Sequence, residues 1–270
     1  MSKKSAIVKR LSKKDIYAMY GIEFKREKSG EYIYSPEFGW ITPLLQNGNT
    51  KVGKNVWTWS TLPTNSSFTI TINDRVYTEF GTCACHCVGC YATKGNYNYS
   101  TTIQALFVRT WLARHALEFV KNAIQAQIAA DHIALLRIHA AGDFFSDDYA
   151  NMWAGIVEKN PNVLFWTYTK VTEFENMFDA FANANIVKSL IPGYGFNFVH
   201  SDYILRVYKA LKAAGVKVYI CRCGVDDNQH CTDCHGCVDN DYVLFIEHGT
   251  GYKAEKDPAY NELKNIIECQ

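Results

Sequence analysis

The sequence has little net charge, no long apolar run and no low-complexity tract. Its 28 lysines and arginines nearly balance 27 aspartates and glutamates, so no overall field indicates a polyanionic partner. No apolar run reaches the length of about 18 residues that crosses a bilayer, and no apolar signal segment follows the basic N-terminus. These absences lead us to expect a cytoplasmic protein.

The composition indicates a globular chain with a sizeable core. Hydrophobic residues make up 48% of the 270 positions, and the 17 tyrosines and 15 phenylalanines argue against disorder. We expect residues 1–55 to form a basic N-terminal arm and a β-rich segment, and residues 251–270 to form a C-terminal helix. Between them, residues 56–250 are expected to form an α/β metal-binding core with a cysteine-rich insertion at 221–240.

The first 14 residues carry six basic side chains and no acidic one. A solvated, frayed arm and a contact with nucleic acid both explain this run. The basic residues are Lys3, Lys4, Lys9, Arg10, Lys13 and Lys14.

The first half of the chain favours strands and then a long helix. Val56–Trp59 is expected to be a strand, and Phe68–Ile72 with Arg75–Thr78 a hairpin that turns at Asn73 and Asp74. The apolar spacing across Thr101–Asp131 predicts a helical stretch.

Strands and helices alternate after residue 131. Strands are expected at Ile133–Ala140, Val163–Thr169, Tyr194–Val199, Val216–Ile220 and, less clearly marked, Val243–Glu247. Helices are expected at Asp147–Lys159 after the cap Ser146, from Thr172 through Phe181, and from Ser201 to Gly215. This order predicts an α/β fold with a parallel sheet, either open or a partial (β/α) barrel, and functional groups at the carboxyl ends of its strands.

Nine of the ten cysteines fall into two tight groups. Disulfides are the alternative use for so many cysteines, but neighbours two to four residues apart suit one metal centre better, and no export signal is present. Cys269 stands apart and is expected to be an ordinary thiol.

The first group contains Cys83, Cys87 and Cys90 in C-x3-C-x2-C spacing. Three thiolates on one loop can hold three irons of a [4Fe-4S] cluster and leave the fourth iron open. Cys85 and His86 lie inside the same loop, so a zinc site that uses one of them as the fourth ligand is the alternative.

The C-x3-C-x2-C loop resembles the signature of the radical S-adenosylmethionine (SAM) enzymes. The resemblance implies a radical-SAM-like partial barrel, SAM bound at the open iron, and an electron donor such as a flavodoxin or ferredoxin. In that family a Gly-Gly-Glu triplet at a strand end holds the SAM ammonium, and Ala141, Gly142 and Asp143 would take its place here. A plain strand-to-helix turn is the alternative interpretation of Gly142 and Asp143.

The match departs from the family pattern in three ways. Gly89 stands where an aromatic residue is usual before the third cysteine, the acid is aspartate, and Cys85 and His86 are additional ligands.

Other polar residues stand in or at the ends of expected strands, where a parallel fold places its ligands. Side chains two residues apart in a strand lie on the same face. Arg137 and His139 are therefore expected to share one face of their strand, and Tyr168 and Lys170 one face of theirs, so each pair could point into a barrel. A lone buried histidine is more often a satisfied core residue. Tyr168 and Asn197 complete the expected SAM contacts, and His200 lies nearby in the sequence.

The second group comprises Cys221, Cys223, Cys231, Cys234 and Cys237. Its C-x2-C-x2-C run is the ferredoxin type, and Cys221 or Cys223 at a strand end can complete the set. Four thiolates would close an auxiliary [4Fe-4S] cluster used for electron transfer or structure. A zinc site is the alternative, because C-x2-C steps serve both metals.

A second resemblance, to the phage and plasmid gene product 88 family, covers roughly residues 55–245. It rests on Trp57–Ser60, Leu62-Pro63, the Cys83–Ala92 loop, Lys94-Gly95, the strand from Arg137 to Phe144, Tyr168–Lys170 and the late cysteine group. The resemblance implies a mobile-element origin and little about chemistry.

Two hypotheses follow. The first is a radical-SAM-like enzyme that cleaves SAM reductively and carries an auxiliary cluster. The second is a phage-encoded, nucleic-acid-associated protein with structural iron–sulfur or zinc sites and a basic arm on phosphate.

Overall fold

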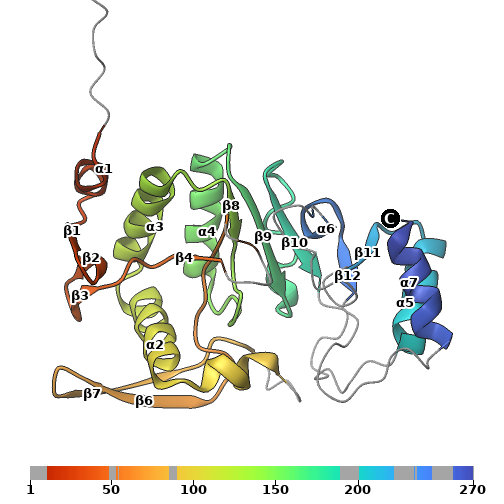
Figure 1. Ribbon diagram of the computed structural model, residues 1–270, viewed down its shortest axis with the longest axis horizontal. Helices are drawn as coiled ribbons and strands as arrows, with labels where there is room; N and C mark the ends of the chain where they lie inside the picture. The colour runs from red at the N-terminus through yellow and green to blue at the C-terminus, as the bar shows by residue number, and fades with distance from the viewer. Residues whose placement is uncertain are drawn as a thin grey trace, which may run out of the picture.

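The computed structural model describes residues 11–48, 53, 55–84, 90–188, 201–221, 234, 236–244 and 258–269. Three regions follow one another from left to right in Figure 1: an N-terminal antiparallel sheet, a central mostly parallel sheet with helices, and a small C-terminal unit. No helix among these residues is both long and apolar enough to span a membrane.

The N-terminal region consists of α1 (Lys13–Met19) and a sheet of β1 (Phe24–Glu27), β2 (Gly30–Ser35) and β3 (Gly39–Ile41). Ser12 and Asp15 form a reciprocal capping box at the start of α1. Lys13 binds Glu31 of β2 and Asp131 at the end of α3 (Leu117–Asp131). Within the basic run, Lys13 therefore forms ion pairs that join α1 to β2 and α3. Lys3, Lys4, Lys9 and Arg10 lie outside the described residues.

The central sheet has the order β10-β9-β8-β5-β4. Its strands are β4 (Gln46–Asn47), β5 (Val56–Thr58), β8 (Leu135–Arg137), β9 (Leu164–Thr169) and β10 (Ala184–Lys188). Strands β5, β8, β9 and β10 are parallel and lie side by side in chain order, and β4 pairs antiparallel with β5. The fold is thus mixed α/β, and the described strands form an open sheet.

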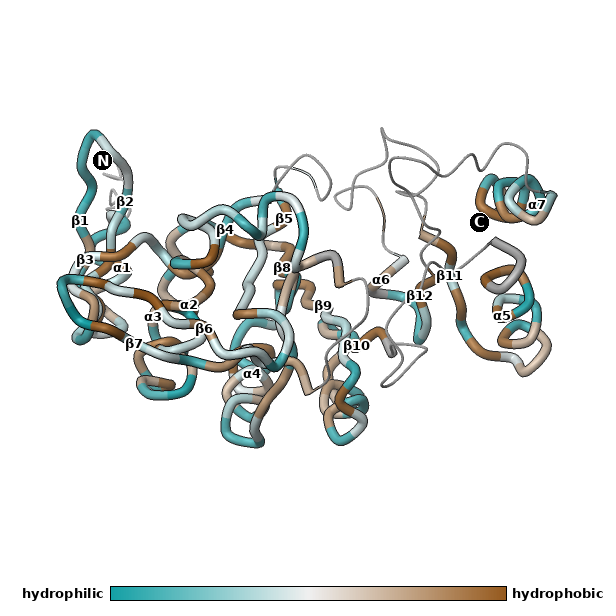
Figure 2. Tube along the Cα trace, turned by 90° about the horizontal axis from the view of Figure 1, so that it is seen from below, coloured by the Kyte–Doolittle hydropathy of each residue, from teal (hydrophilic) through white to brown (hydrophobic). Residues whose placement is uncertain are grey.

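The two faces of this sheet have different cover. Leu136 and Phe165 point into the main core with Trp153 and Ile156 of α4 (Asp147–Lys159) and with α3. Leu135, Trp166 and Val56 point to the opposite face, where Tyr168 and Cys237 pack on them. Hydrophobic segments, brown in Figure 2, include β8 in the middle of the molecule and parts of α2, α3 and β11.

A long crossover joins β5 to β8. It contains the hairpin of β6 (Ser67–Ile72) and β7 (Arg75–Phe80), then the first cysteine loop, the short 3-10 helices η1 (Tyr91–Thr93) and η2 (Gly95–Asn98), and the helices α2 (Ser100–His115) and α3. Asn73 and Asp74 turn the hairpin in the left-handed conformation, with φ of 50° and 61°. The predicted hairpin is therefore confirmed, because its turn chemistry and its strands agree.

The C-terminal unit contains α5 (Ser201–Ala213), β11 (Val218–Ile220), α6 (Gly236–Asp239), β12 (Tyr242–Leu244) and α7 (Pro258–Glu268). β11 and β12 are parallel, and their apolar side chains form a small core with those of α5 and α7. Asn185 of β10 donates to the carbonyls of Cys237 and Asn240 and so attaches this unit to the central sheet.

Several expected elements differ in the structure. The stretch Thr101–Asp131 is two helices, because Ala116 leaves the helical conformation at φ −143° and ψ 49°. The helix expected from Thr172 through Phe181 is only the 3-10 turn η3 (Thr172–Phe174) followed by further turns, whose hydrogen bonds span three residues. The strand expected at Tyr194–Val199 lies outside the described residues, as does the end of the one expected at Val243–Glu247.

Candidate functional site

The segments that follow β5 and β8 run side by side beyond the sheet. Trp59 N–H donates to the carbonyl of Arg137, Ala140 N–H to that of Trp59, and Thr61 N–H to that of Ala141, each within 3.0 Å. This extended pairing carries both chains to the carboxyl edge of the sheet, where Gly142 and Asp143 lie.

Gly142 occupies a position that only glycine fits. Its φ of +87° is in the left-handed region, and a Cβ atom would overlap the hydroxyl oxygens of Thr61 and Thr82. These two hydroxyls are 2.9 Å apart and hydrogen-bond each other. The backbone of Gly142 is therefore packed directly against the threonine pair.

The Asp143 carboxylate joins the ends of two strands. It accepts hydrogen bonds from the Phe144 amide at 2.8 Å, the Thr169 hydroxyl at 2.7 Å and the Lys170 amide at 3.0 Å. Burial raises the pKa of Asp143 to about 6, although the three hydrogen bonds oppose that shift. Asp143 thus faces the end of β9, while Ser146 caps α4.

The first cysteine loop begins beside this strand end. The Asp143 amide donates to the Thr82 hydroxyl at 3.0 Å, and Thr82 and Cys83 amides donate to the carbonyls of Leu62 and Thr64. Cys83 and Cys90 are partly buried. Cys85, His86 and Cys87 lie outside the described residues, so the structure does not place all three predicted ligands.

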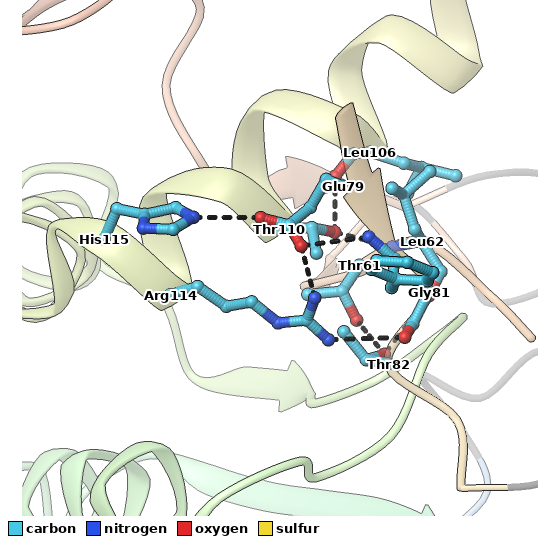
Figure 3. A network of polar contacts seen from close by, with 10 residues as sticks. Thr61, Leu62, Glu79, Gly81, Thr82, Leu106, Thr110, Arg114 and His115 are labelled. Atoms are coloured by element: carbon cyan, nitrogen blue, oxygen red, sulfur yellow. Dashed lines mark hydrogen bonds and ion pairs between the residues drawn. The ribbon is translucent and has the colours of Figure 1, made fainter. Parts of the chain in front are cut away.

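A buried charge network fixes the approach to this loop. Glu79 at the end of β7 is bound by Arg114 and by His115 of α2, and Arg114 also donates to the carbonyl of Gly81 at 3.3 Å (Figure 3). Burial alone would raise the pKa of Glu79, but hydrogen bonds from Phe80 N–H, His115 and Arg114 hold it below its usual value. The base of the loop is therefore tied to α2 on one side and to the strand ends on the other.

His139 does not share a face with Arg137, contrary to the alternation expected from the sequence. Its φ of +56° breaks the strand, and its ring lies on the helix-covered side, hydrogen-bonded to the Tyr149 hydroxyl of α4 at 2.8 Å. Tyr149 also accepts from the indole of Trp59 at 2.8 Å. Burial, with the Arg137 charge nearby, lowers the pKa of His139 to about 3, so it is a neutral, satisfied core residue.

The second cysteine group meets the opposite face of the central sheet. The Tyr168 hydroxyl lies 2.6 Å from the sulfur of Cys237, and the Tyr219 hydroxyl of β11 lies 3.3 Å from the sulfur of Cys234. The Arg137 guanidinium stands 5.0 Å from the centre of the Tyr168 ring. Burial of the phenol, together with Cys237 beside it, raises the pKa of Tyr168.

Cys221 extends β11, and its amide donates to the carbonyl of Leu244 at 2.8 Å. Cys223 and Cys231 lie outside the described residues. Across the described part of the chain, no three histidine, cysteine, aspartate or glutamate side chains are grouped closely enough to hold a metal ion.

Comparison with known proteins places the chain in a family. The model for "Gene product 88" matches residues 43–240, which is most of the chain. The chain belongs to the gene product 88 family. Among curated proteins it resembles the Gene 88 protein of Mycobacterium phage L5, with 40% identity over 62 residues, and that of Mycobacterium phage D29, with 37% identity over 62 residues. The alignments cover 23% of this chain and 24% of each of these relatives. No solved structure matches.

The gene product 88 region includes both cysteine groups and the Gly142–Asp143 strand end, but not α7. Within it, sequence reasoning missed Thr61, Thr82 and Thr169, because nothing local marks a threonine as the partner of a distant glycine or aspartate. It also missed Tyr219, the Glu79–Arg114 pair and Arg109. Asn197 and His200 lie outside the described residues, and Cys269 is exposed at the end of α7.

Arg109 of α2 is a buried charge in this gene product 88 protein. Its side chain is only 3% exposed. Burial alone lowers its pKa to about 10, with no carboxylate contributing. Within the described part of the chain the guanidinium has no hydrogen-bond or ion-pair partner.

Proposed function

We propose that this protein is an iron–sulfur enzyme of the radical SAM type. Cys83, Cys87 and Cys90 would hold a [4Fe-4S] cluster, and SAM would bind at the carboxyl edge of the central sheet. When bound, such a cluster supplies the electron for reductive cleavage of SAM.

One observation carries the proposal. The Asp143 amide donates to the Thr82 hydroxyl, so the residue before Cys83 is held at the strand end that carries Gly142 and Asp143. The spacing of the cysteines and the strand end were inferred separately from the sequence, and this bond brings them together. The two proposed ligands that the structure describes are of the type an iron–sulfur cluster needs, since Cys83 and Cys90 are partly buried thiols on the loop that starts there.

The sheet supports the same proposal. Strands β5, β8, β9 and β10 are parallel and adjacent in chain order, and α3 and α4 cover one face only. In a partial barrel the large helices lie outside, so the opposite face, which carries the short α6 with Cys237 here, would be the inner one. Arg137, Trp166 and Tyr168 lie on the inner face in this interpretation.

Asp143 has a modified role in the proposal. Asp143 is only 5% exposed, and its carboxylate already accepts three hydrogen bonds, so it is poorly placed to take the SAM ammonium as well. We therefore assign Gly142 and Asp143 as positioning residues that hold the cysteine loop against the strand ends. Tyr168, whose hydroxyl faces Cys237, is assigned to the second site, and Asn197 keeps its proposed contact with SAM.

The second cysteine group would hold an auxiliary cluster through Cys231, Cys234, Cys237 and one of Cys221 or Cys223. Hydrogen bonds to ligand sulfurs are common around such centres, and the hydroxyls of Tyr168 and Tyr219 are within reach of two of them. Zinc is the alternative metal at both groups. A flavodoxin or ferredoxin would supply electrons.

Anaerobic purification tests the proposal directly. Iron, sulfide and zinc are measured in the unaltered protein, and dithionite-dependent formation of 5′-deoxyadenosine from SAM is followed by chromatography. We expect about eight irons per chain if both clusters form, as two four-iron clusters require. Zinc in place of iron, or iron without SAM cleavage, would contradict the enzyme proposal.

Variants separate the two sites. Cys83→Ser and Cys90→Ser should abolish SAM cleavage and remove about half of the iron, because each cluster would hold four. Cys234→Ser should remove the other half and lower the melting temperature, since metal binding is coupled to folding. Cys269→Ser, which changes an exposed cysteine on α7, is the matched control and should alter none of these quantities.

A further inference from the structure

The hairpin of β6 and β7 is a sheet of its own with an open edge. Figure 1 draws it along the lower margin of the molecule, below α2. Among the strands that the structure describes, β6 pairs only with β7. An unpaired edge strand presents a row of backbone N–H and C=O groups that another strand can bind. The free side of β6 is therefore a candidate surface for strand pairing.

The turn shows which backbone groups of β6 point to the open edge. Both residues of the two-residue turn have positive φ, so Ile72 and Arg75 on either side of it form a hydrogen-bonded pair. In an antiparallel ladder such pairs alternate with pairs that exchange no backbone hydrogen bonds. The backbone N–H and C=O groups of Thr69 and Thr71 therefore point away from β7.

The apolar side chains of β6 are incompletely covered. Phe68, Ile70 and Ile72 alternate along the strand and point toward the body of the protein, where they pack at the margins of two apolar clusters. Each of the three is only partly buried. Glu79 of β7, which stands opposite Phe68, is by contrast buried. A further strand beside β6 would cover apolar surface that the described chain leaves in water, which is favourable.

β6 lacks the features that usually keep an edge strand from pairing. Those features are charged side chains, proline and bulges. No charged residue stands between Lys54 and Asp74, and the strand itself contains no proline. Its register with β7 runs through six consecutive pairs without a bulge. The edge is therefore open to a partner strand.

The residue pattern of β6 suits a second copy of the same strand. Its solvent-facing side chains are those of Ser67, Thr69 and Thr71, and its inward side chains are apolar. Two such strands, paired antiparallel around a two-fold axis, place hydroxyls beside hydroxyls and apolar side chains beside apolar ones, with no like charges in contact. The hairpin already contains one pair of this kind, since Thr69 and Thr78 are opposite each other and their hydroxyl oxygens are 2.9 Å apart.

We infer that the free edge of β6 is a dimerisation surface, on which β6 of a second copy of this chain pairs antiparallel. The hairpins of the two copies then form one continuous sheet. A two-fold axis uses the same edge of both copies, so the assembly closes at two chains and does not extend into a fibre. Two paired strands bury less than the area of about 1,600 Å² of a standard interface, so we expect a weak dimer with a dissociation constant on the order of 10 μM. The inference is independent of the proposed function, because the hairpin contains no cysteine.

Sedimentation velocity over a range of protein concentrations tests the inference. The protein is purified anaerobically and kept with a reductant, so that its cysteines do not cross-link. The test variant is Thr69→Lys, and Thr78→Lys is the matched control. Both residues are exposed, both changes add one charge to the same face of the hairpin, and both remove the same hydrogen bond. Only Thr69 lies on β6.

We expect the unaltered protein to pass from monomer to dimer as its concentration rises. Thr69→Lys should weaken the dimer by about 10-fold or more, because pairing brings two added lysines close together. Thr78→Lys should leave the dissociation constant within about 2-fold of the unaltered value, since exposed charges away from the contact have little effect. Hydrogen exchange should be slower in β6 of the dimer than in β6 of the monomer, with no change in β7.

Three results would overturn the inference. The first is a monomer at every concentration. The second is equal weakening of the dimer by both variants, because the contact would then use the exposed face of the hairpin, where Val76 and Phe80 stand open, instead of its edge. The third is a dimer in which β6 exchanges as fast as in the monomer. If Thr69→Lys does not fold, Thr71→Lys takes its place, with Val76→Lys as the control from the opposite position on β7.

Discussion

At the scale of single residues, Gly142 shows how one missing side chain allows the strand ends to meet. Its left-handed φ and the threonine pair packed against its backbone both exclude a larger residue. We expect Gly142→Ala to lower the free energy of unfolding by more than about 1 kcal/mol, the range for alanine placed where φ is positive. Gly155→Ala is the control, because Gly155 lies in α4 with open space around it, and it should be neutral or stabilising. Equal denaturation midpoints for the two variants in urea would contradict this account.

Asp143 should give the protein a characteristic dependence on pH. Because its pKa is raised from 3.8 to about 6 in the folded state, the folded protein binds more protons than the unfolded chain between these values. The contribution of Asp143 therefore becomes less favourable as pH rises from about 4 to 6, by at most about 3 kcal/mol. Urea denaturation at a series of pH values measures the effect as the difference between the unaltered protein and Asp143→Asn.

Asp143→Asn should lose this pH-dependent contribution, since an amide does not titrate. Below pH 4, where Asp143 is protonated in the unaltered protein, the variant should also have a lower free energy of unfolding. The reason is that the introduced side-chain amide faces the Lys170 N–H, which donates to Asp143 in the unaltered protein. Glu31 and Glu79, whose pKa values are lowered, change stability in the opposite direction with pH in both proteins and cancel in the difference. Parallel pH profiles for the two proteins would show that Asp143 does not titrate in this range.

At the scale of elements, β7 is joined to α2 by the ion pair of buried Glu79 with Arg114 and by the ring contact of Tyr77 with Trp111. Arg114→Leu would leave Glu79 buried with only His115 and the Phe80 amide as partners. We expect a loss of about 2 to 4 kcal/mol in the free energy of unfolding, since breaking a buried pair exposes the cost of the remaining charge. Arg26→Leu, at the exposed Arg26–Glu31 pair, should cost less than about 1 kcal/mol.

A further measurement shows whether this network positions the cysteine loop. If it does, Arg114→Leu should also speed proteolysis near residues 81–84, whereas Arg26→Leu should not. Similar stability losses in the two variants would mean that the Glu79 pair behaves as a surface pair.

The elements that could be predicted are those whose signals are local. Ser146 caps α4 as expected, and the Asn73-Asp74 turn gives the hairpin register. The break at Ala116 has no such signal, because alanine has the highest intrinsic helix propensity of all residues. In the turns after Thr172, Phe178 is buried in the main core, and its contacts with residues distant in the chain cannot be predicted from the local sequence.

For the candidate site, the sequence predicts that Gly142 and Asp143 stand at a strand end, but it does not predict which residues contact them. Gly142 and Asp143 are where a parallel sheet places functional groups, but the partners of Asp143 are 26 and 27 residues away in the chain. Alternation failed at His139 because one left-handed residue moves a side chain to the other face. The contact of Tyr168 with Cys237 joins residues 69 apart and depends on how the C-terminal unit docks.

At the scale of the whole molecule, the described residues form one large apolar core, a separate core in the C-terminal unit and two smaller clusters. The main core joins the N-terminal sheet, α3, α4 and the central strands, whereas a small separate core holds α5, β11, β12 and α7 together. The described links between them include the hydrogen bonds of Asn185 to the carbonyls of Cys237 and Asn240, the contact of Tyr168 with Cys237, and the packing of Cys237 on Trp166. A unit attached in this way can open without the rest of the protein unfolding.

This arrangement predicts that damage to the small core stays local. Leu263 of α7 is fully buried there, and Leu263→Ala should cost about 2 to 5 kcal/mol within the unit. In hydrogen exchange we expect faster exchange in α5, β11, β12 and α7 and unchanged protection in β5, β8 and β9. Leu136→Ala, an equally buried change in the main core, is the matched control and should speed exchange in the central strands. If Leu263→Ala speeds exchange equally in both regions, the protein unfolds as one cooperative unit, and the C-terminal unit does not open separately from the central sheet.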